Sequence, residues 1–366
     1  MTAPARTTAR IARDRRFSRP GATFASSSRY VALVVALIFG VAVVVTVSIS
    51  VGTVPIGPDV VWATITSHLA GTTGPGTAAE DQIVWTVRFP RTLLGILVGA
   101  ALAVAGAVIQ AVVRNPLGDP YLIGIVPGAG LGAVIVIVLG SGAVGGLSIT
   151  AAAFAGAMAA FIATFALGRQ QGRWPAVRLV LAGVAIGYLI SAFTYFLQTV
   201  ATPGQLQRVL FWTLGSVSGA TWEDLPILTV IVAVAMLWLV ANGRRLNGLA
   251  GGTELAASLG INVGRFQLQL MGLIALMTGA VVAVVGGIGF VGLMIPHLAR
   301  LLVGADHRRV LVVSLLGGAI FLPLADIVAR TLIPPTEIPI GIVTAAVGAP
   351  FFIWLLATLG RAGPRS

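Results

Sequence analysis

Long uncharged apolar runs alternate with short polar segments along most of the chain. The run at residues 92–113 has 22 residues, carries no charge and holds only two polar side chains, Thr92 and Gln110. As a helix it is about 33 Å long, which is enough to cross a hydrocarbon core of about 30 Å. The pattern predicts an all-α polytopic membrane protein. Its ten expected spans lie near residues 30–50, 92–113, 121–139, 147–167, 179–200, 225–240, 266–285, 289–303, 310–329 and 338–359.

The polar segments between these runs differ in what they predict. Residues 51–85, rich in Gly, Pro and Thr, are expected to form an extramembrane loop with one short helix. Residues 204–220 fit an amphipathic or re-entrant segment, and residues 243–265 form the longest polar stretch of the second half. Pro296 is expected to break the short eighth span.

The arginines predict the orientation in the membrane. With the amino terminus inside and alternating spans, 19 of the 23 arginines fall on the cytoplasmic side. This asymmetry follows the positive-inside rule and places both termini in the cytoplasm. Seven arginines lie in the tail at residues 1–29, which we expect to be disordered and to set topology, although net charge +12 alone is also compatible with nucleic acid or anionic lipid. The transmembrane domain is expected at residues 30–361.

A faint internal repeat relates the second and seventh spans. LVGAALAVAGA from Leu97 matches MTGAVVAVVGG from Met277 at five of eleven positions, and Pro116 lies opposite Pro296 at the same offset. Because the two spans cross in opposite directions, the match is typical of an inverted repeat in a transporter. A composition rich in small residues also accounts for most of such a match.

Composition excludes several classes of protein. The chain is 57% hydrophobic and 9% charged, with a mean hydropathy of +1.00, whereas soluble domains carry about 25% charged residues. It has no lysine, so it lacks a P-loop, and no cysteine, so it lacks disulfides and thiolate metal sites. The three histidines have no metal-ligand spacing, and nothing resembles a catalytic triad. We therefore expect no enzyme activity, no metal and no cofactor bound by the chain.

A few charged residues stand where the membrane disfavours them. Arg88 and Arg91 lie three residues apart at an external span mouth, where they fit either snorkelling to lipid phosphates or a socket for acidic groups of an external partner. Asp326 lies inside a span, four residues before Arg330. That spacing suits a self-neutralising pair, with a proton relay as the alternative.

The cytoplasmic segment GGTELAASLGI at residues 251–261 predicts a short helix. Thr253 is a candidate cap, Leu255 and Leu259 share a face, and Gly260 is expected to stop the helix. Such a helix either covers lipid headgroups or docks in a groove of a partner protein.

These motifs together resemble the FecCD family, the BtuC-like permeases of type II ABC importers. The resemblance runs over residues 30–361. The matching pieces are RFPR at 88–91, GAALAVAGAVIQ ending at Gln110, RNPLGDP at 114–120, AASLG at 256–260, GFVGLMIPHLAR from Gly289, GADHR at 304–308, ADIVAR ending at Arg330 and PIGIVTAAVGAP at 339–350.

The resemblance implies a set of partners in a bacterial cytoplasmic membrane. It implies ten helices in each permease, and a second permease copy in a homodimer or a heterodimer. Two ATPase subunits, which hold ATP and magnesium, are implied on the cytoplasmic side. A periplasmic or lipid-anchored substrate-binding protein is implied outside. Nucleic acid is not an expected partner, and membrane lipids are.

The resemblance also assigns roles to residues that match its motifs. Arg88, Arg91 and Arg330 match arginines that receive acidic residues of the binding protein, and Asn115 and Leu117 match residues of the cytoplasmic gate. Residues 243–265 correspond to the segment that couples to the ATPase. Within it, the residues expected to contact the ATPase are Glu254, Ala257, Ser258, Leu259 and Gly260.

The cargo expected first is a ferric siderophore, with cobalamin and haem as alternatives. Because such cargo arrives already chelated, the permease needs no ligand motif that would identify it. The alternatives from other classes are an ion-coupled secondary transporter, which requires several buried titratable groups, and a scaffolding membrane protein.

Overall fold

The computed structural model describes residues 27–72, 74, 76–172 and 174–360, so most of the predicted Arg-rich tail lies outside the described residues. Its described part is helical and contains no β-strand. The α-helices are α1 (Ser27–Ser50), α2 (Pro58–Ala70), α3 (Ala78–Gln82), α4 (Phe89–Val113), α5 (Ile125–Leu139), α6 (Ile149–Gly168), α7 (Ala176–Thr199), α8 (Pro203–Leu214), α9 (Leu225–Ala241), α10 (Gly243–Ala250), α11 (Thr253–Ser258), α12 (Val263–Val285), α13 (Val291–Val303), α14 (His307–Thr331) and α15 (Ile340–Gly360). A π-helical stretch, η1 (Ile83–Arg88), joins α3 to α4, and two short 3₁₀ turns are η2 (Pro120–Ile123) and η3 (Ser141–Val144).

The helices confirm a multi-pass membrane protein but leave the number of spans open. Among the described residues, six helical stretches are long and apolar enough to cross a bilayer, and α9 with α10 adds a seventh if this pair, bent by 68°, counts as one span. Three shorter apolar helices, α5, α13 and α15, are the remaining candidates. The expected count of ten spans therefore stays a prediction, as does the inverted repeat.

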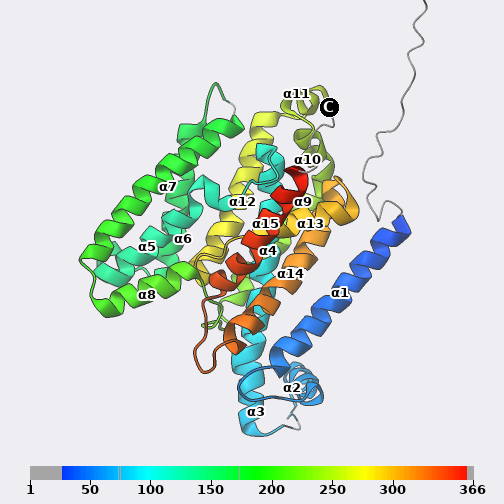
Figure 1. Cartoon of the computed structure of the whole chain (residues 1–366), viewed down its shortest axis with the longest axis vertical. Helices are drawn as coiled ribbons and strands as arrows, with labels where there is room; N and C mark the ends of the chain where they lie inside the picture. The colour runs from blue at the N-terminus through cyan, green and yellow to red at the C-terminus, as the bar shows by residue number, and fades with distance from the viewer. Residues whose placement is uncertain (1–26, 73, 75, 173, 361–366) are drawn as a thin grey trace, which may run out of the picture.

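Helix α4 forms the centre of the bundle. It packs against α1, α9, α12, α13 and α14, and most of its side chains are buried. A second group, α5 to α8, lies to one side of it and is joined to the centre through α12, whereas α1 lies on the opposite side against α14 (Figure 1). Helices α2 and α3 lie at one end of the molecule, and α10 and α11 lie at the other (Figure 1).

Glycine pairs bring the central helices into backbone contact. A Cβ atom on Gly106 would lie 1.9 Å from the carbonyl oxygen of Gly292 in α13, and a Cβ atom on Gly99 would lie 2.1 Å from that of Gly318 in α14. Without a hydrophobic driving force between helices in lipid, such close packing is a main source of association. The small residues of α4 thus set its distance from its neighbours.

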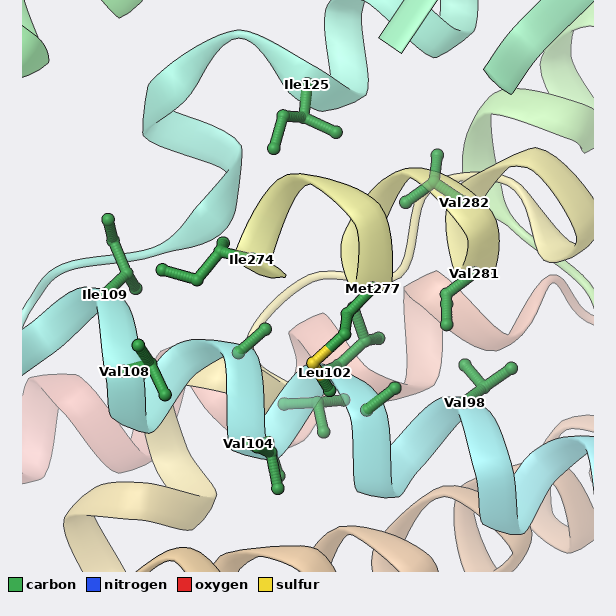
Figure 2. Packing of buried hydrophobic residues seen from close by; sticks show 14 of the residues in the cluster. Val98, Leu102, Val104, Val108, Ile109, Ile125, Ile274, Met277, Val281 and Val282 are labelled. Carbon is green, nitrogen blue, oxygen red and sulfur yellow. The ribbon is translucent and has the colours of Figure 1, made fainter. Parts of the chain in front are cut away.

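Larger side chains fill the space between α4 and α12. Figure 2 shows Leu102 of α4 beside Met277 of α12 and Val98 of α4 near Val281 of α12, all within one buried apolar cluster. The expected match between the second and seventh spans therefore corresponds to two helices that touch each other.

The segment before α4 is more ordered than its composition suggests. The expected loop at residues 51–85 contains α2, α3 and the start of η1, so the prediction of one short helix is wrong. Thr77 begins α3 with a capping box, in which its hydroxyl accepts a hydrogen bond from the Glu80 N–H (3.3 Å) and its own N–H donates to the Glu80 carboxylate (2.8 Å). A small apolar cluster of its own stabilises this end of the molecule, formed by Ile49, Ile56, Val61, Ile65 and Val84.

Pro296 does not break its helix. Helix α13 continues through it from Val291 to Val303, which corrects the expected interruption. The carbonyl of Gly292, four residues earlier, loses its usual backbone donor at a proline. The side-chain Nε2 of Gln110 replaces that donor at 3.0 Å.

Candidate functional site

The three arginines predicted to receive a binding protein lie together at the α2–α3 end of the bundle. Arg88 closes η1, Arg91 is in the first turn of α4, and Arg330 is in the last turn of α14. Arg88 is 5% exposed and Arg91 is 8% exposed. All three side chains have partners inside the chain, so the snorkelling interpretation does not describe their placement.

Arg91 is held by two carboxylates. Its Nε and Nη2 donate to Asp326 at 3.0 and 2.8 Å, while its Nη1 and Nη2 donate to Glu337 at 2.9 and 3.0 Å. Both edges of the guanidinium therefore form bidentate pairs, the strongest geometry available to arginine. Glu337 was not singled out in the sequence. Its position gave a usable signal, because it is an acidic residue in the loop that follows the span carrying Arg330.

Arg330 and Arg88 use backbone carbonyls instead. Arg330 donates through Nη2 to the carbonyl oxygen of Ser48, and its Nε lies 3.7 Å from Asp326, beyond hydrogen-bond distance. Arg88 donates to the carbonyl oxygens of Ile49 (2.7 Å) and Val54 (2.6 Å). The expected Asp326–Arg330 pair is thus the weaker contact of Asp326, because Arg91 approaches the same carboxylate 0.9 Å more closely, at 2.8 against 3.7 Å.

We call the group Arg88, Arg91, Arg330, Asp326 and Glu337 the arginine cluster. It holds three guanidinium groups and two carboxylates, so it carries one excess positive charge. In the described part of the chain, no ion pair joins a carboxylate to Arg88. A cavity of about 210 Å³ opens against the cluster and is lined by Arg88, Arg91, Arg330 and Glu337 with residues 52–54. Chemically, this arrangement can accept a further anion.

The predicted gate residues lie in the turn that follows α4, at the other end of that helix. Arg114 ends α4 with a left-handed backbone (φ 52°), and the Asn115 side chain accepts a hydrogen bond from the Leu117 N–H at 2.9 Å. Both Asn115 and Leu117 are exposed. The turn is thus shaped by its own polar groups and presents an apolar side chain outward.

Asp119 closes this turn and is buried. Its carboxylate accepts a hydrogen bond from the Tyr121 N–H at 2.8 Å and caps η2. Burial raises the pKa of the Asp119 carboxyl to about 6, against the smaller lowering effect of that hydrogen bond. A cavity of about 320 Å³ separates Asn115 and Asp119 from the start of α7 at Ala176 and Val177.

A polar contact not assigned from the sequence crosses the bundle near this turn. The Nη2 of Arg300 in α13 donates to Oε1 of Gln110, whose Nε2 binds the Gly292 carbonyl described above. The amide of Gln110 is therefore satisfied on both sides inside an apolar environment. Gln110 was noticed only as a polar exception in an apolar run, which was the available signal.

The predicted coupling segment forms two helices, α10 and α11. Of its expected contact residues, Glu254, Ala257, Ser258, Leu259 and Gly260 are all exposed. Gly260 stops α11 with a left-handed backbone (φ 75°), as expected, but Gly252 and not Thr253 is the residue that precedes the helix. The cap prediction for Thr253 is therefore wrong.

This segment is tied to the core of the bundle. Asn247 of α10 donates to Asp306 at 2.9 Å and accepts a hydrogen bond from the His307 N–H at 2.8 Å, which fixes α10 to the turn before α14. Ala256 is the buried residue of α11, whereas Leu255 and Leu259 are 48% and 63% exposed. Leu255 and Leu259 are four residues apart, so the same side of this helix presents two exposed apolar side chains.

Comparison with known proteins identifies the family. The sequence pattern of the FecCD transport family matches residues 37–358. The chain belongs to the FecCD transport family. It is an ABC importer permease, and members of this kind are transport subunits and not enzymes.

Individual relatives of this FecCD permease cover most of its length. A cobalamin import system permease from Halobacterium salinarum is 42% identical over 296 residues, 81% of this chain and 79% of that protein. A vitamin B12 import permease from Salmonella paratyphi A is 40% identical over 308 residues, 82% of this chain and 93% of that protein. A solved inward-facing ABC transporter of metal-chelate type is 30% identical, with a TM-score of 0.78, and covers 90% of this chain and 100% of its own.

Proposed function

We propose that this FecCD permease imports cobalamin as the membrane-spanning subunit of an ABC importer. The observation that carries the proposal is the 42% and 40% identity to two permeases named for cobalamin or vitamin B12 import, over about four fifths of this chain. The order expected from sequence, with ferric siderophore before cobalamin, is thereby reversed.

A ferric siderophore is the second candidate cargo. It is favoured by the 30% identity and the TM-score of 0.78 to a transporter of metal-chelate type. Haem, the third expected cargo, is not favoured by either comparison.

On the external side, we propose that a substrate-binding protein docks on the arginine cluster. The support is electrostatic, because the cluster carries one excess positive charge beside a cavity of about 210 Å³. Charge complementarity of this kind steers encounter and fixes register more than it adds affinity.

On the opposite side, we propose that two ATPase subunits contact α11 and that a second permease copy completes the pathway. The exposed pair Leu255 and Leu259 supports the contact with the ATPase. The hydrogen bonds of Asn247 to Asp306 and His307 connect α10 to α14, so a movement of the ATPase can be transmitted to the bundle. The turn with Asn115 and Leu117 follows the end of α4 that contacts α10, and this position supports a cytoplasmic gate. In this orientation both termini are cytoplasmic.

The buried charges support this function over ion-coupled transport. Asp326, the acid that suited a proton relay, is bound by Arg91 at 2.8 Å within the bundle. An ion path needs further buried titratable groups in line with it. Among the described residues of the central helices, the carboxylate of Asp326 has Arg91 and Arg330 as its charged neighbours.

The test is uptake of radiolabelled cobalamin and of a radiolabelled ferric siderophore, measured side by side in a deletion strain and in the same strain carrying the wild-type gene. Loss and recovery of cobalamin uptake alone is the expected result. Loss and recovery of siderophore uptake alone replaces the cargo and keeps the transporter class. Uptake that survives ATP depletion but stops with a proton uncoupler contradicts an ABC mechanism.

A further inference from the structure

Glu337 and Asp326 bind two adjacent edges of the Arg91 guanidinium, which share Nη2, but they differ in their surroundings. The Asp326 side chain is 4% exposed and belongs to the packed interior of α14. The Glu337 side chain is 44% exposed and comes from the loop between α14 and α15. One carboxylate is therefore part of the core, whereas the other can leave Arg91 without opening the bundle.

The arginine cluster has room and charge for another carboxylate. The Nε of Arg330 is buried and has no hydrogen-bond partner in the described part of the chain, and the Arg330 side chain is 7% exposed. Within the described residues, the Arg88 guanidinium is bound by carbonyl oxygens alone. The cavity of about 210 Å³ lies directly against these groups and against Glu337. A buried, unpartnered cationic donor beside a cavity indicates a site that is incomplete without an anion.

We infer that Glu337 is a tethered substitute for a carboxylate of an external protein partner. Glu337 neutralises the outer edge of Arg91 while no protein is docked on the arginine cluster. When a protein docks, one of its acidic side chains displaces Glu337. This inference rests on the proposed docking function. To that proposal, the inference adds that the partner must displace Glu337. It also explains why the arginine cluster is stable when no partner is docked.

The exchange is favourable on physical grounds. A half-exposed ion pair contributes little, because water screens it and the loop loses freedom to hold it. A partner that covers the cluster excludes water, which strengthens its own carboxylate contacts with Arg91 and gives the Arg330 Nε an acceptor. The displaced Glu337 returns to solvent, where its charge is hydrated.

Displacement of Glu337 acts close to the last helix. Glu337 precedes the start of α15 at Ile340 by three residues, and this short link is held by the bond from Ile338 N–H to the Ala329 carbonyl (2.9 Å) and by that from Ile340 N–H to the Gly215 carbonyl (3.1 Å). Release of the Glu337 side chain leaves those two backbone bonds as the remaining hydrogen-bonded anchors of the link. Docking therefore removes one restraint on the link at the beginning of α15.

The absence of cysteine makes a direct test possible. Thr336, exposed and next to Glu337, is changed to cysteine in the full-length chain and labelled with a nitroxide, which is then the only label. The protein is placed in lipid nanodiscs, and the probe is a pentaglutamate peptide. We expect an immobile nitroxide spectrum that becomes mobile as the peptide binds. With Glu337→Gln added, we expect a mobile spectrum without peptide and a dissociation constant about tenfold lower, because the internal competitor is gone.

The matched control is Glu223→Gln, which removes an exposed carboxylate from the loop before α9 without touching the arginine cluster. It is expected to leave both the spectrum and the affinity unchanged. If Glu337→Gln does not fold, Glu337→Asp keeps the charge but shortens the reach, and an intermediate mobility is expected.

An unchanged spectrum and affinity in the Glu337 variants overturn the inference, as does an equal gain in Glu223→Gln. A response to citrate that equals the response to the peptide assigns the site to free polycarboxylates and overturns the protein partner. The assay needs neither cargo nor ATPase, so failed cobalamin uptake with a positive result here rejects the cargo and not the role of Glu337.

Discussion

The side-chain nitrogen of Gln110 lies 3.0 Å from the carbonyl oxygen of Gly292, the group that Pro296 deprives of its helical donor. A side chain of α4 thus donates the hydrogen bond that the backbone of α13 lacks. Arg300 binds the opposite end of the same amide, so a glutamine in an otherwise apolar run of α4 keeps α13 continuous. In lipid, where no water can satisfy the carbonyl, this substitution of donors is required.

Gln110→Leu is expected to lower the free energy of unfolding by about 1–3 kcal/mol, because it leaves the Gly292 carbonyl unsatisfied in the core. Thermal unfolding of the purified protein in detergent measures the loss. Pro296→Ala returns a backbone donor to that carbonyl, so the same change in the Pro296→Ala background should cost less. Equal losses in both backgrounds would show that Gln110 acts through Arg300 alone.

Gly106→Ala is expected to be strongly destabilising, by about 3 kcal/mol or more, because the new methyl group meets backbone and not a movable side chain. Its Cβ would lie 1.9 Å from the Gly292 carbonyl oxygen. The yield of folded protein and its melting temperature report the effect. Gly272→Ala in α12 is the matched control, because a Cβ atom at that position would have nothing within 4 Å. A similar loss at both positions would contradict the contact.

Asp119→Asn should stabilise the protein at neutral pH and have less effect in acid. The folded-state pKa of about 6 lies above the usual value of about 3.9, so the folded state keeps a proton that the unfolded state has released. The stability contributed by Asp119 is therefore present below about pH 4, falls as the pH rises to about 6, and is then constant. The gain in Asp119→Asn is at most about 3 kcal/mol at pH 7.5. Melting curves at pH 4.5 and 7.5 test this, and an equal gain at both would refute it.

Leu259→Ser tests the contact proposed for the ATPase. The side chain is 63% exposed, so melting temperature should change little, whereas ATP-dependent uptake should fall about tenfold because an apolar anchor is lost. The control is Leu69→Ser, which exposes a polar group at a leucine that is 75% exposed in α2, at the opposite end of the molecule. Normal uptake by Leu259→Ser would remove α11 from the proposed interface.

Much of the fold was accessible from the apolar pattern alone. The uncharged run of residues 92–113 forms most of α4, and Gly260 stops α11 as its backbone freedom predicts. The pattern worked because the bilayer imposes length and polarity on every crossing helix. It could not show that α4 is continuous with α3, because residues 78–88 are helical through a capping box and a tertiary cluster and not through apolar periodicity.

The arginine cluster shows a different limit. Spacing along the chain suggested that Asp326 pairs with Arg330, four residues on, but Arg91, 235 residues away, holds that carboxylate more closely. Local sequence reveals neighbours on one helix and not the side chains that a second helix brings in. The position of Glu337 shortly after an arginine-bearing span was visible in the sequence, but its pairing with Arg91 was not, since the two lie 246 residues apart.

The continuous helix from Ala78 to Val113 has 36 residues, about 54 Å if straight, and bears Arg88 and Arg91 toward one end and the turn of Asn115 and Leu117 just beyond the other. Neighbouring helices pack closely around α4, the longer part of this helix. If this helix tilts as one rigid body, a movement at the arginine end is carried to the turn at the other end. A tilt of about 5° about one end carries the other end by about 5 Å, roughly the rise of one helical turn.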